Sequence, residues 1–517
     1  MTITNSKQRK FGVVLQYFQM GISLLIQLIY TPVMLKILGN NEYGIYNVSN
    51  SIISYLSLLS LGFGASYIRF YSIYKKNDDK DGIKSLNGMY LTVFIVIGLV
   101  ALVLGLILSS NVKLFYNGTY SESELEIAKI LMMFLSINLA ISFPASVFTS
   151  YITSQEKFIW QKIINMVTTI LSPVSNIILL YCGYGSIGMV IATTCISFLV
   201  MLTNIWFCFN KLRMQVSFKK FDWHLLKDIF VFSIFIAINQ IIDQINWQTD
   251  KVILGKVVNG TAVSIYAIAS NINSMYINFS TAISSVFTPK INRIVAENKN
   301  DVNQKLTDLM IKVGRLQFFV VMLILTGFIF FGQYFISIWV GLEYLDAYYV
   351  ALLLICPVTL SLIQNIGIEI RRAKNMHKIV SLFMFATAIL NVCVSIWFAQ
   401  LWGVIGVALG TTISLVVNIM VIDIYYQTKI KLNIGKFYKN IIFALPSFLI
   451  PSICGIIMMV YWKPTSIYLF VLQICIYTII YCVSVFMIGL NKDEKLKIKT
   501  AVNKILIRKK DKNDNNI

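Results

Sequence analysis

The sequence has 517 residues, of which 57% are hydrophobic and only 13% are charged, and its mean hydropathy is +0.73. Soluble domains contain roughly 25% charged residues, so this composition excludes a soluble globular protein and indicates an integral membrane protein. The formal net charge is +21, but no soluble stretch interleaves basic and exposed aromatic residues, which argues against a nucleic-acid partner.

Apolar windows long enough to cross a bilayer recur along the whole chain. A helix needs roughly 20 apolar residues to span the hydrocarbon core, and by this criterion we expect about fourteen transmembrane helices in an all-α fold. The expected spans are 11–35, 46–73, 86–110, 125–153, 159–182, 185–208, 229–253, 262–288, 313–337, 347–370, 379–401, 403–426, 438–461 and 465–490. The first run has no small-residue cleavage site, so we do not expect a signal peptide.

Lysine and arginine indicate the orientation of these spans, because cytoplasmic loops carry an excess of both residues. Loops on the side of the N-terminus hold most of the 44 basic residues. The opposite side keeps Lys36, Lys113, Lys129, Lys251, Lys256 and Lys463. We therefore predict that both termini are cytoplasmic.

Two motifs occur twice in the chain. The Gly-rich start of the sixth span at Gly185 reappears at Gly403 in the twelfth, and Lys36-Ile-Leu-Gly39 is echoed by Val252-Ile-Leu-Gly255. Because six is an even number, both copies of a six-span repeat enter the membrane from the same side. The two copies then form a parallel repeat about an axis along the membrane normal. The predicted parts are an N-terminal six-helix lobe (1–210), a basic inter-lobe cytoplasmic loop (211–228), a C-terminal six-helix lobe (229–430), two appended transmembrane helices (438–490) and a basic cytoplasmic tail (491–517).

Four of the predicted spans, the first two of each copy, carry one polar face at helical spacing. A helix in lipid must turn such a face toward water or toward other helices. We predict that these faces line a wet cavity at the repeat interface, where transporters commonly place their substrate site. The alternative is that the polar groups only form hydrogen bonds between helices. The predicted cavity residues are Gln16, Gln27, Tyr30, Asn239, Asp243, Asn246, Asn271 and Asn278.

Three charged residues in or near the seventh span are candidates for ion coupling or gating. A carboxylate such as Asp243, near the middle of a span, costs roughly 2.5 to 3.5 kcal/mol to insert, so it is usually functional or paired. It can carry a proton or Na⁺. Asp250 and Lys251 follow near the outer end, where the alternatives are a structural ion pair and a gating role. No nucleophile elbow, HExxH, phosphate-binding loop, dinucleotide fingerprint or paired metal ligands occur, so we predict a transporter without enzymatic activity or cofactor.

Several motifs resemble those of a known family. They are Leu38-Gly39 followed by Glu42-Tyr43-Gly44-Ile45-Tyr46, Leu61-Gly62-Phe63-Gly64 with Arg69, Thr249-Asp250-Lys251 through Gly255 with Tyr266-Ala267, and the Gly-rich starts at Gly185 and Gly403. Over about residues 10 to 490 the chain resembles the polysaccharide-biosynthesis (O-antigen, Wzx-type) flippases of the multidrug/oligosaccharidyl-lipid/polysaccharide (MOP) exporter superfamily. The resemblance implies two lobes in a V-shaped, MATE-like arrangement around a central cavity.

The resemblance also implies a function in the bacterial cytoplasmic (inner) membrane. The protein would move an undecaprenyl-diphosphate-linked oligosaccharide to the outer leaflet. This oligosaccharide would be the unit of an O-antigen, a capsule or a similar surface polysaccharide. The implied partners are membrane lipids, a glycan polymerase and other assembly proteins. A diphosphate needs cations, and the candidates are Arg69, Lys290 and Arg293. The alternative for all three is the positive-inside rule itself.

Two other functions compete with the flippase. The acidic Asp243 departs from the cationic cavity expected of this family and would suit a cation-coupled multidrug (MATE-type) antiporter. A membrane glycan polymerase is disfavoured, because the predicted outer loops are short and leave little room for a catalytic domain.

Overall fold

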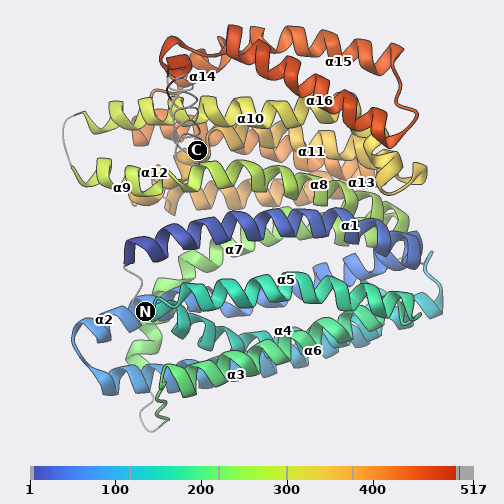
Figure 1. The fold of residues 1–517 in the computed structure, drawn as a ribbon. Coiled ribbons are helices and arrows are strands. Elements are labelled where there is room, and N and C mark those ends of the chain that lie inside the picture. The colour runs from blue at the N-terminus through green and yellow to red at the C-terminus, as the bar shows by residue number, and fades with distance from the viewer. Residues whose placement is uncertain are drawn as a thin grey trace, which may run out of the picture. The chain divides into compact units, whose positions relative to one another are not determined.

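The computed structural model describes residues 5–116, 118–218, 222–297, 301–374, 376, 378–496 and 500, without the side chains of residues 5–17, 235, 285 and 378. Within these ranges the chain is helical and has no strand (Figure 1). This confirms the predicted all-α class, which follows from the apolar runs because a helix satisfies its own backbone groups in lipid.

The helices follow one another with short connections. The α-helices are α1 (Asn5–Ser54), α2 (Phe63–Lys76), α3 (Lys80–Ser110), α4 (Glu122–Ser154), α5 (Phe158–Tyr181), α6 (Gly185–Trp206), α7 (Trp223–Val257), α8 (Gly260–Ser285), α9 (Thr288–Ala296), α10 (Val302–Trp339), α11 (Asp346–Ile363), α12 (Asn365–Ala373), α13 (Lys378–Tyr425), α14 (Ile434–Ile442), α15 (Leu449–Tyr461) and α16 (Ile467–Ser484). Among the shorter helical turns are η1 (Tyr55–Ser60), η4 (Leu342–Tyr344), η5 (Tyr426–Ile430) and η7 (Val485–Gly489).

Ten helical segments in the described ranges are long and apolar enough to cross a membrane, or eleven when the bent pair within α7 is taken as one span. The predicted number of fourteen is therefore not confirmed. Two of the segments, Phe18–Lys76 with 59 residues and Ile379–Ile430 with 52, are much longer than one crossing requires. Each contains a glycine with non-helical, positive-φ backbone, Gly39 (φ 73°) and Gly403 (φ 56°), at a predicted span boundary. The difference in number thus partly reflects two predicted spans within one continuous segment.

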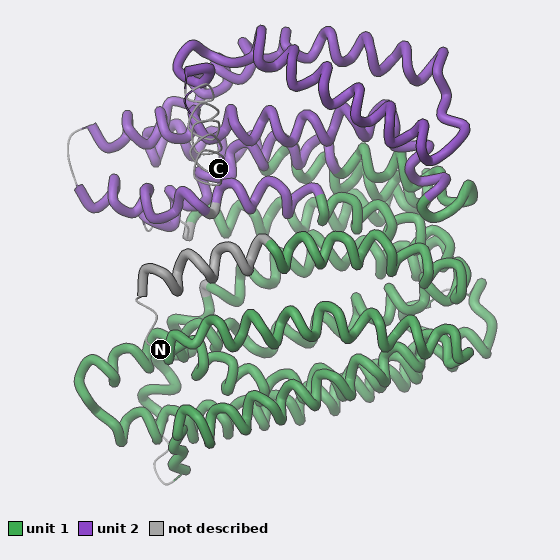
Figure 2. The backbone as a smooth tube through the Cα atoms, in the orientation of Figure 1, with its two compact units in different colours: residues 1–275, 339–354, 378–418 green, residues 276–338, 355–377, 419–517 purple. Residues whose placement is uncertain are grey.

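The chain divides into two compact units (Figure 2). Unit 1 comprises residues 1–275, 339–354 and 378–418, and unit 2 comprises residues 276–338, 355–377 and 419–517. The predicted lobes and their orientation in the membrane remain predictions. Parts of the predicted inter-lobe loop (219–221) and of the basic tail (497–499 and 501–517) lie outside the described residues.

In unit 1, α4 packs against α3 and α6, and α1 packs against α4, α5 and α7. Small residues allow the close approach of α3 to α4: a Cβ at Gly98 would lie 2.8 Å from the carbonyl oxygen of Ala140. Aromatic side chains fill the core beside these helices, among them the buried Tyr67, Tyr90 and Phe94. This packing positions α1 and α7, which carry the candidate site.

In unit 2, a buried arginine joins α10 to the segment that directly follows α16 and η7. The guanidinium of Arg315 donates to both carboxylate oxygens of Glu494 at 3.0 Å and to the carbonyl oxygens of Asn440 and Gly489 at 2.7 Å. A buried charge with a complete set of partners is structurally stable, whereas an unpaired one is costly. This arginine is therefore a structural residue.

Candidate functional site

The polar face of α7 divides into two parts with different surroundings. One part carries Gln244 and Gln248, which bond to α1 and η1: the Gln248 side chain accepts from Ser51 at 3.0 Å, and Gln244 donates to the hydroxyl of Ser57 at 3.2 Å. Ser54 donates to Gln244 at 3.3 Å. For these glutamines the alternative explanation holds, because they join two helices rather than face water.

The other part of the α7 face holds the predicted cavity residues. The Asp243 side chain is exposed, Asn246 is half-buried, and Asn239 is half-buried and accepts from Ser381 at 3.0 Å. An exposed carboxylate within an apolar helix fits a wall that meets water, whereas Asn239 joins α7 to α13. Asp250, one turn beyond Asn246, is only 1% exposed.

The remaining predicted cavity residues have individual environments. Gln27 on α1 is half-buried, and Tyr30 accepts a hydrogen bond from Asn176 at 2.9 Å. Asn271 on α8 lies 3.5 Å from the hydroxyl of Tyr43, and Asn278 is exposed. The side chain of Gln16 lies outside the described residues. The continuous cavity wall therefore remains a prediction, with Asp243 and Asn278 as its exposed members.

A buried cluster of oxygen atoms surrounds Asp250 in unit 1. Its Oδ2 accepts hydrogen bonds from the hydroxyl of Tyr266 on α8 and from the hydroxyl of Thr411 on α13, the latter at 2.7 Å. Its Oδ1 is buried and has no hydrogen-bond partner among the described residues. A buried carboxylate oxygen without a partner is costly unless a proton or a cation accompanies it.

Further oxygen atoms lie next to this carboxylate on both halves of α13. The Oγ1 of Thr411 is 3.3 Å from Oδ1 of Asn391 and 3.3 Å from the carbonyl oxygen of Val407, and Ser395 donates to Asn391 at 3.0 Å. Carboxylate, amide, hydroxyl and carbonyl oxygens are the ligands that hard cations prefer. One negative charge among neutral oxygens is suited to a proton or a monovalent cation.

The residues around Asp250 were only partly predictable. The sequence identifies Asp250 as a candidate and Tyr266 as part of a motif and as a ring that could stack on a sugar, whereas Asn391 and Ser395 carry no signal of their own. Thr411 belongs to the repeated Gly-rich motif that begins at Gly403, which was the available signal. Lys251 forms no ion pair with Asp250 in the described part of the chain, although it is adjacent in sequence.

The two repeats meet at corresponding glycines. The offset that relates Gly39 to Gly255 also relates Gly44 on α1 to Gly260 at the start of α8. A Cβ at Gly44 would lie 2.2 Å from the carbonyl oxygen of Gly260, which no side chain can tolerate without a backbone shift. A two-fold axis that relates the two repeats and passes between these positions would bring them into contact.

Hydrogen bonds surround this glycine contact. Ser264 donates to the carbonyl oxygen of Asn40 at 2.5 Å, and Thr261 lies 3.3 Å from Oδ1 of Asn41. The Glu42 carboxylate accepts from the backbone N–H of Ser186 at 2.7 Å and so caps the start of α6, where a negative charge is favourable. These contacts give a physical reason for the Glu-Tyr-Gly motif and join α1 to α6 and α8.

The three predicted diphosphate ligands are exposed cations. The guanidinium of Arg69 on α2 lies 4.4 Å from the ring centre of Phe232 on α7, a cation–π contact within unit 1. Lys290 and Arg293 lie in unit 2, one turn apart on the exposed side of α9. All three are accessible to a ligand, and their role remains a prediction.

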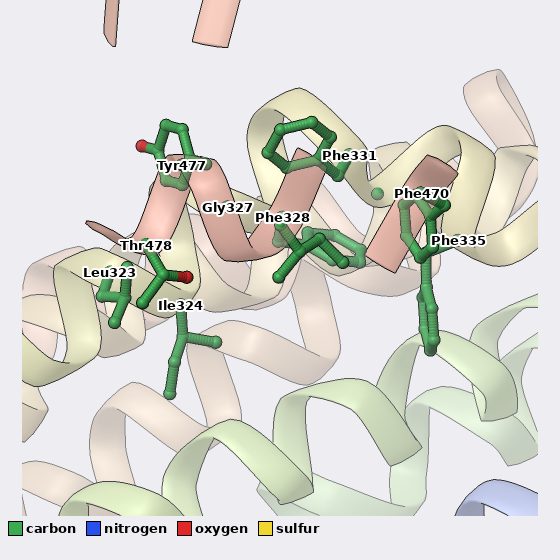
Figure 3. A pocket seen from close by; sticks show the side chains of 11 residues that line it. Leu323, Ile324, Gly327, Phe328, Phe331, Phe335, Phe470, Tyr477 and Thr478 are labelled. Carbon is green, nitrogen blue, oxygen red and sulfur yellow. The ribbon is translucent and has the colours of Figure 1, made fainter. Parts of the chain in front are cut away.

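An apolar groove lies in unit 2 between α10 and α16 (Figure 3). It has a volume of about 290 Å³, and its walls include the rings of Phe328, Phe331, Phe335 and Phe470. The hydroxyls of Tyr477 and Thr478 are the polar side-chain groups among its lining residues. A groove of this character suits a hydrocarbon chain and does not suit a sugar.

Solved structures share this fold at low sequence identity. The lipid II flippase MurJ, in an inward closed conformation, matches with a TM-score of 0.73 and 18% identity over 92% of this chain and 98% of that chain. An inward-facing multidrug resistance MATE family transporter of the MOP superfamily matches with a TM-score of 0.64 and 16% identity, over 81% and 96%. A MOP superfamily transporter from Pyrococcus furiosus has a TM-score of 0.56 and 16% identity, over 81% and 95%.

At these identities the similarity establishes the fold alone, and no curated protein sequence matches the chain. A family model described as polysaccharide biosynthesis protein matches residues 33–349, which is more than half of the chain. The matched range includes α7, α8 and the glycine contact at Gly44. The chain therefore belongs to the polysaccharide biosynthesis protein family and is a multi-pass membrane protein with the fold of the MOP exporter superfamily.

Proposed function

We propose that this protein is a flippase that moves an undecaprenyl-diphosphate-linked oligosaccharide from the cytoplasmic to the outer leaflet of the bacterial inner membrane. The observation that carries the proposal is the match to a polysaccharide biosynthesis family in a chain that has the fold of membrane transporters. The oligosaccharide would be the unit of an O-antigen, a capsule or a similar surface polysaccharide, which a glycan polymerase then extends.

The physical task of such a protein is to shield a polar headgroup from hydrocarbon. Sugar hydroxyls and a diphosphate are too polar to cross the bilayer unaided, whereas the lipid tail can remain in it. Amides and carboxylates on α7 and α8, including the exposed Asp243 and Asn278, can replace water around the sugar. Arg69, Lys290 and Arg293 are the proposed contacts of the diphosphate, since guanidinium and ammonium groups bind phosphate oxygens.

The proposed energy source is a cation that binds at Asp250. Its unpartnered carboxylate oxygen and the neighbouring oxygens of Thr411 and Asn391 offer a place for H⁺ or Na⁺. Because α7 and α8 both contribute to this cluster, binding there can favour one arrangement of the two helices over another. Transport would then proceed by alternating access, with the ends of the lobes parting at Gly44 and Gly260.

A reconstitution experiment tests the proposal. Proteoliposomes receive a lipid-linked oligosaccharide with a fluorescent sugar, and a membrane-impermeant quencher reports how much of it is exposed on the outer leaflet. We expect exposure to rise with protein and with an imposed H⁺ or Na⁺ gradient. Equal exposure in protein-free liposomes would refute the flippase function.

Asp243 provides a second prediction within this function. Asp243→Asn should abolish surface polysaccharide in cells while the protein level stays unchanged, because the exposed carboxylate is the charge that the wall of α7 presents. Surface polysaccharide is measured by gel staining and protein level by immunoblot. A normal amount of polysaccharide in the variant would remove Asp243 from the mechanism.

The second candidate is a cation-coupled multidrug antiporter. The exposed acidic group of Asp243 favours it, since an acidic wall attracts organic cations. Overexpression followed by drug-susceptibility assays separates the two functions. Drug efflux without a glycan defect on deletion would favour the antiporter, whereas a glycan defect without efflux would favour the flippase.

A further inference from the structure

Arg371, in α12 of unit 2, is a buried arginine that lacks an acidic partner. The residue is 7% exposed, its Nε is buried without a hydrogen-bond partner, and no ion pair to it occurs within the described ranges. The adjacent Arg372 differs in both respects, because its side chain is 69% exposed and pairs with Glu369 at 2.8 Å. Burial of an unpaired charge is costly, so Arg371 requires a partner that the described part of the chain does not supply.

The nearest compensation for this charge is an aromatic ring. The Arg371 guanidinium carbon lies 5.8 Å from the ring centre of Tyr426 in η5, at the limit of a cation–π contact. Gly367, one turn earlier on α12, makes room for that ring, because a Cβ there would lie 2.5 Å from the Tyr426 hydroxyl. This contact orients Arg371 toward the end of α13, and the Nε of Arg371 has no acceptor among the described residues.

Two lysines face the same helical turn. Lys374, three residues after Arg371, donates to the carbonyl oxygen of Ile430 at 3.1 Å and to Asn303. Burial and the charge of Lys431 lower the pKa of Lys374. Neither lysine forms an ion pair in the described part of the chain. Lys374 and Lys431 therefore lie close enough to repel each other, and Arg371 is one turn before Lys374 on α12.

The backbone at this place is also unusual. Lys431 has φ 61° and ψ 40°, a left-handed conformation that is uncommon for a residue other than glycine, asparagine or aspartate. Such conformations are strained for most residues and tend to occur at functional sites. The conformation places Lys431 directly after η5, next to Lys374.

The positive-inside rule does not account for this cluster. That rule predicts exposed lysines and arginines in cytoplasmic loops, as Arg372 is, and gives no reason to bury an arginine without a counter-charge. Asp423, one turn before Tyr426, forms no ion pair with Arg371: its Oδ2 accepts from Tyr438 at 2.6 Å, and its Oδ1 is buried without a partner among the described residues. An anionic ligand is the partner that would satisfy these donors.

We propose that Arg371, Lys374 and Lys431 form a phosphate-binding site at the junction of α12 and η5. The site takes a phosphate or diphosphate ester, with Arg371 as the principal donor because its planar guanidinium can bind two phosphate oxygens at once. Two membrane molecules carry this group, the headgroup of an anionic phospholipid and the diphosphate of a prenyl lipid. The site does not depend on the proposed transport function, since either ligand would bind without being moved.

Thermal unfolding of the full-length protein in detergent tests the site. The probes are inorganic pyrophosphate, farnesyl diphosphate and phosphatidylglycerol, with phosphatidylcholine as the neutral comparison. A ligand that binds the folded state raises the melting temperature in a concentration-dependent way. We expect stabilisation of the wild type by at least one phosphate probe, and a roughly tenfold or greater loss of apparent affinity in Arg371→Gln, since a charge-assisted hydrogen bond is removed.

The neighbouring arginine is the matched control. Arg372→Gln should keep the wild-type affinity, and Arg371→Lys, which retains the charge, should fall between the wild type and Arg371→Gln. Each ligand-induced shift is measured against the same variant without ligand, so a change in basal stability does not interfere. Stabilisation by phosphatidylglycerol or by farnesyl diphosphate supports the site and identifies its source of phosphate.

Two results would overturn the proposal. One is the absence of any phosphate-induced shift in the wild type, and the other is an equal loss of affinity in Arg371→Gln and Arg372→Gln. Neither result bears on transport, which the proteoliposome experiment measures separately.

Discussion

Asp250→Asn should remove the dependence of transport on an ion gradient while the protein remains folded. Asparagine has nearly the same shape and still offers an oxygen to Tyr266 and Thr411, but it carries no charge for a bound cation. Removal of one partner from a buried charge pair costs about 3 to 5 kcal/mol, which corresponds to a loss of cation affinity of roughly 100-fold or more. The measurement is the initial rate of flipping in proteoliposomes with an imposed Na⁺ or H⁺ gradient.

Asp228→Asn is the control for this variant, because Asp228 lies in the same helix with its side chain 55% exposed. It should respond to the gradient as the wild type does. The gradient that drives the wild type identifies the coupling ion. If Asp250→Asn retained the full response, the cluster around Asp250 would have a structural role only.

Substitution of Gly44 should strongly disturb the contact between α1 and α8. In Gly44→Ala the new Cβ would lie 2.2 Å from the carbonyl oxygen and 2.8 Å from the carbonyl carbon of Gly260, and backbone atoms cannot rotate away. Overpacking of this kind typically costs about 1 to 3 kcal/mol. We expect a lower free energy of unfolding and a shift of about 10-fold or more toward conformations in which α1 and α8 are separated at this contact.

Crosslinking measures this shift. Asn41 and Thr261 lie within 3.3 Å of each other through their side chains, so cysteines at both positions should form a disulfide in a background without the 8 native cysteines. Introduction of Gly44→Ala into that background should reduce the crosslinked fraction. Gly21→Ala is the matched control on the same helix, because no atom lies within 4 Å of a Cβ there, and it should leave the crosslink unchanged. An undiminished crosslink in Gly44→Ala would show that the contact relaxes locally.

The polar face of α7 shows what sequence periodicity can predict and what it cannot. Helical spacing places Gln244, Gln248 and Asp243 on a polar side of one helix, and the structure agrees with that placement. The spacing does not tell which of them meets another helix. The serines of α1 and η1 that bond to the two glutamines are almost 200 positions away in sequence, so only packing distinguishes the bonded part from the exposed part.

The two arginines of α12 also differ in a way that the sequence pattern does not predict. Arg371 and Arg372 are identical residues at adjacent positions, and the positive-inside rule predicts that both lie in a cytoplasmic loop. Successive positions on a helix point about 100° apart, so one meets Tyr426 and is buried while the other meets Glu369 and solvent. The need for an external anion becomes visible only once their different burial is known.

The sequence by itself determined that this protein is helical and lies in a membrane, that Gly39 and Gly403 lie at boundaries between spans, and that polar faces follow α7 and α8. These features depend on composition and on local periodicity, which every stretch of the chain carries within itself. The tertiary structure alone decided that Asp250 shares a buried cluster with Thr411 and Asn391, that Gly44 touches Gly260, and that Arg371 is buried without an ion pair to any described residue. Each of these depends on which distant residues come into contact, and pairing between distant segments leaves no local pattern in the sequence.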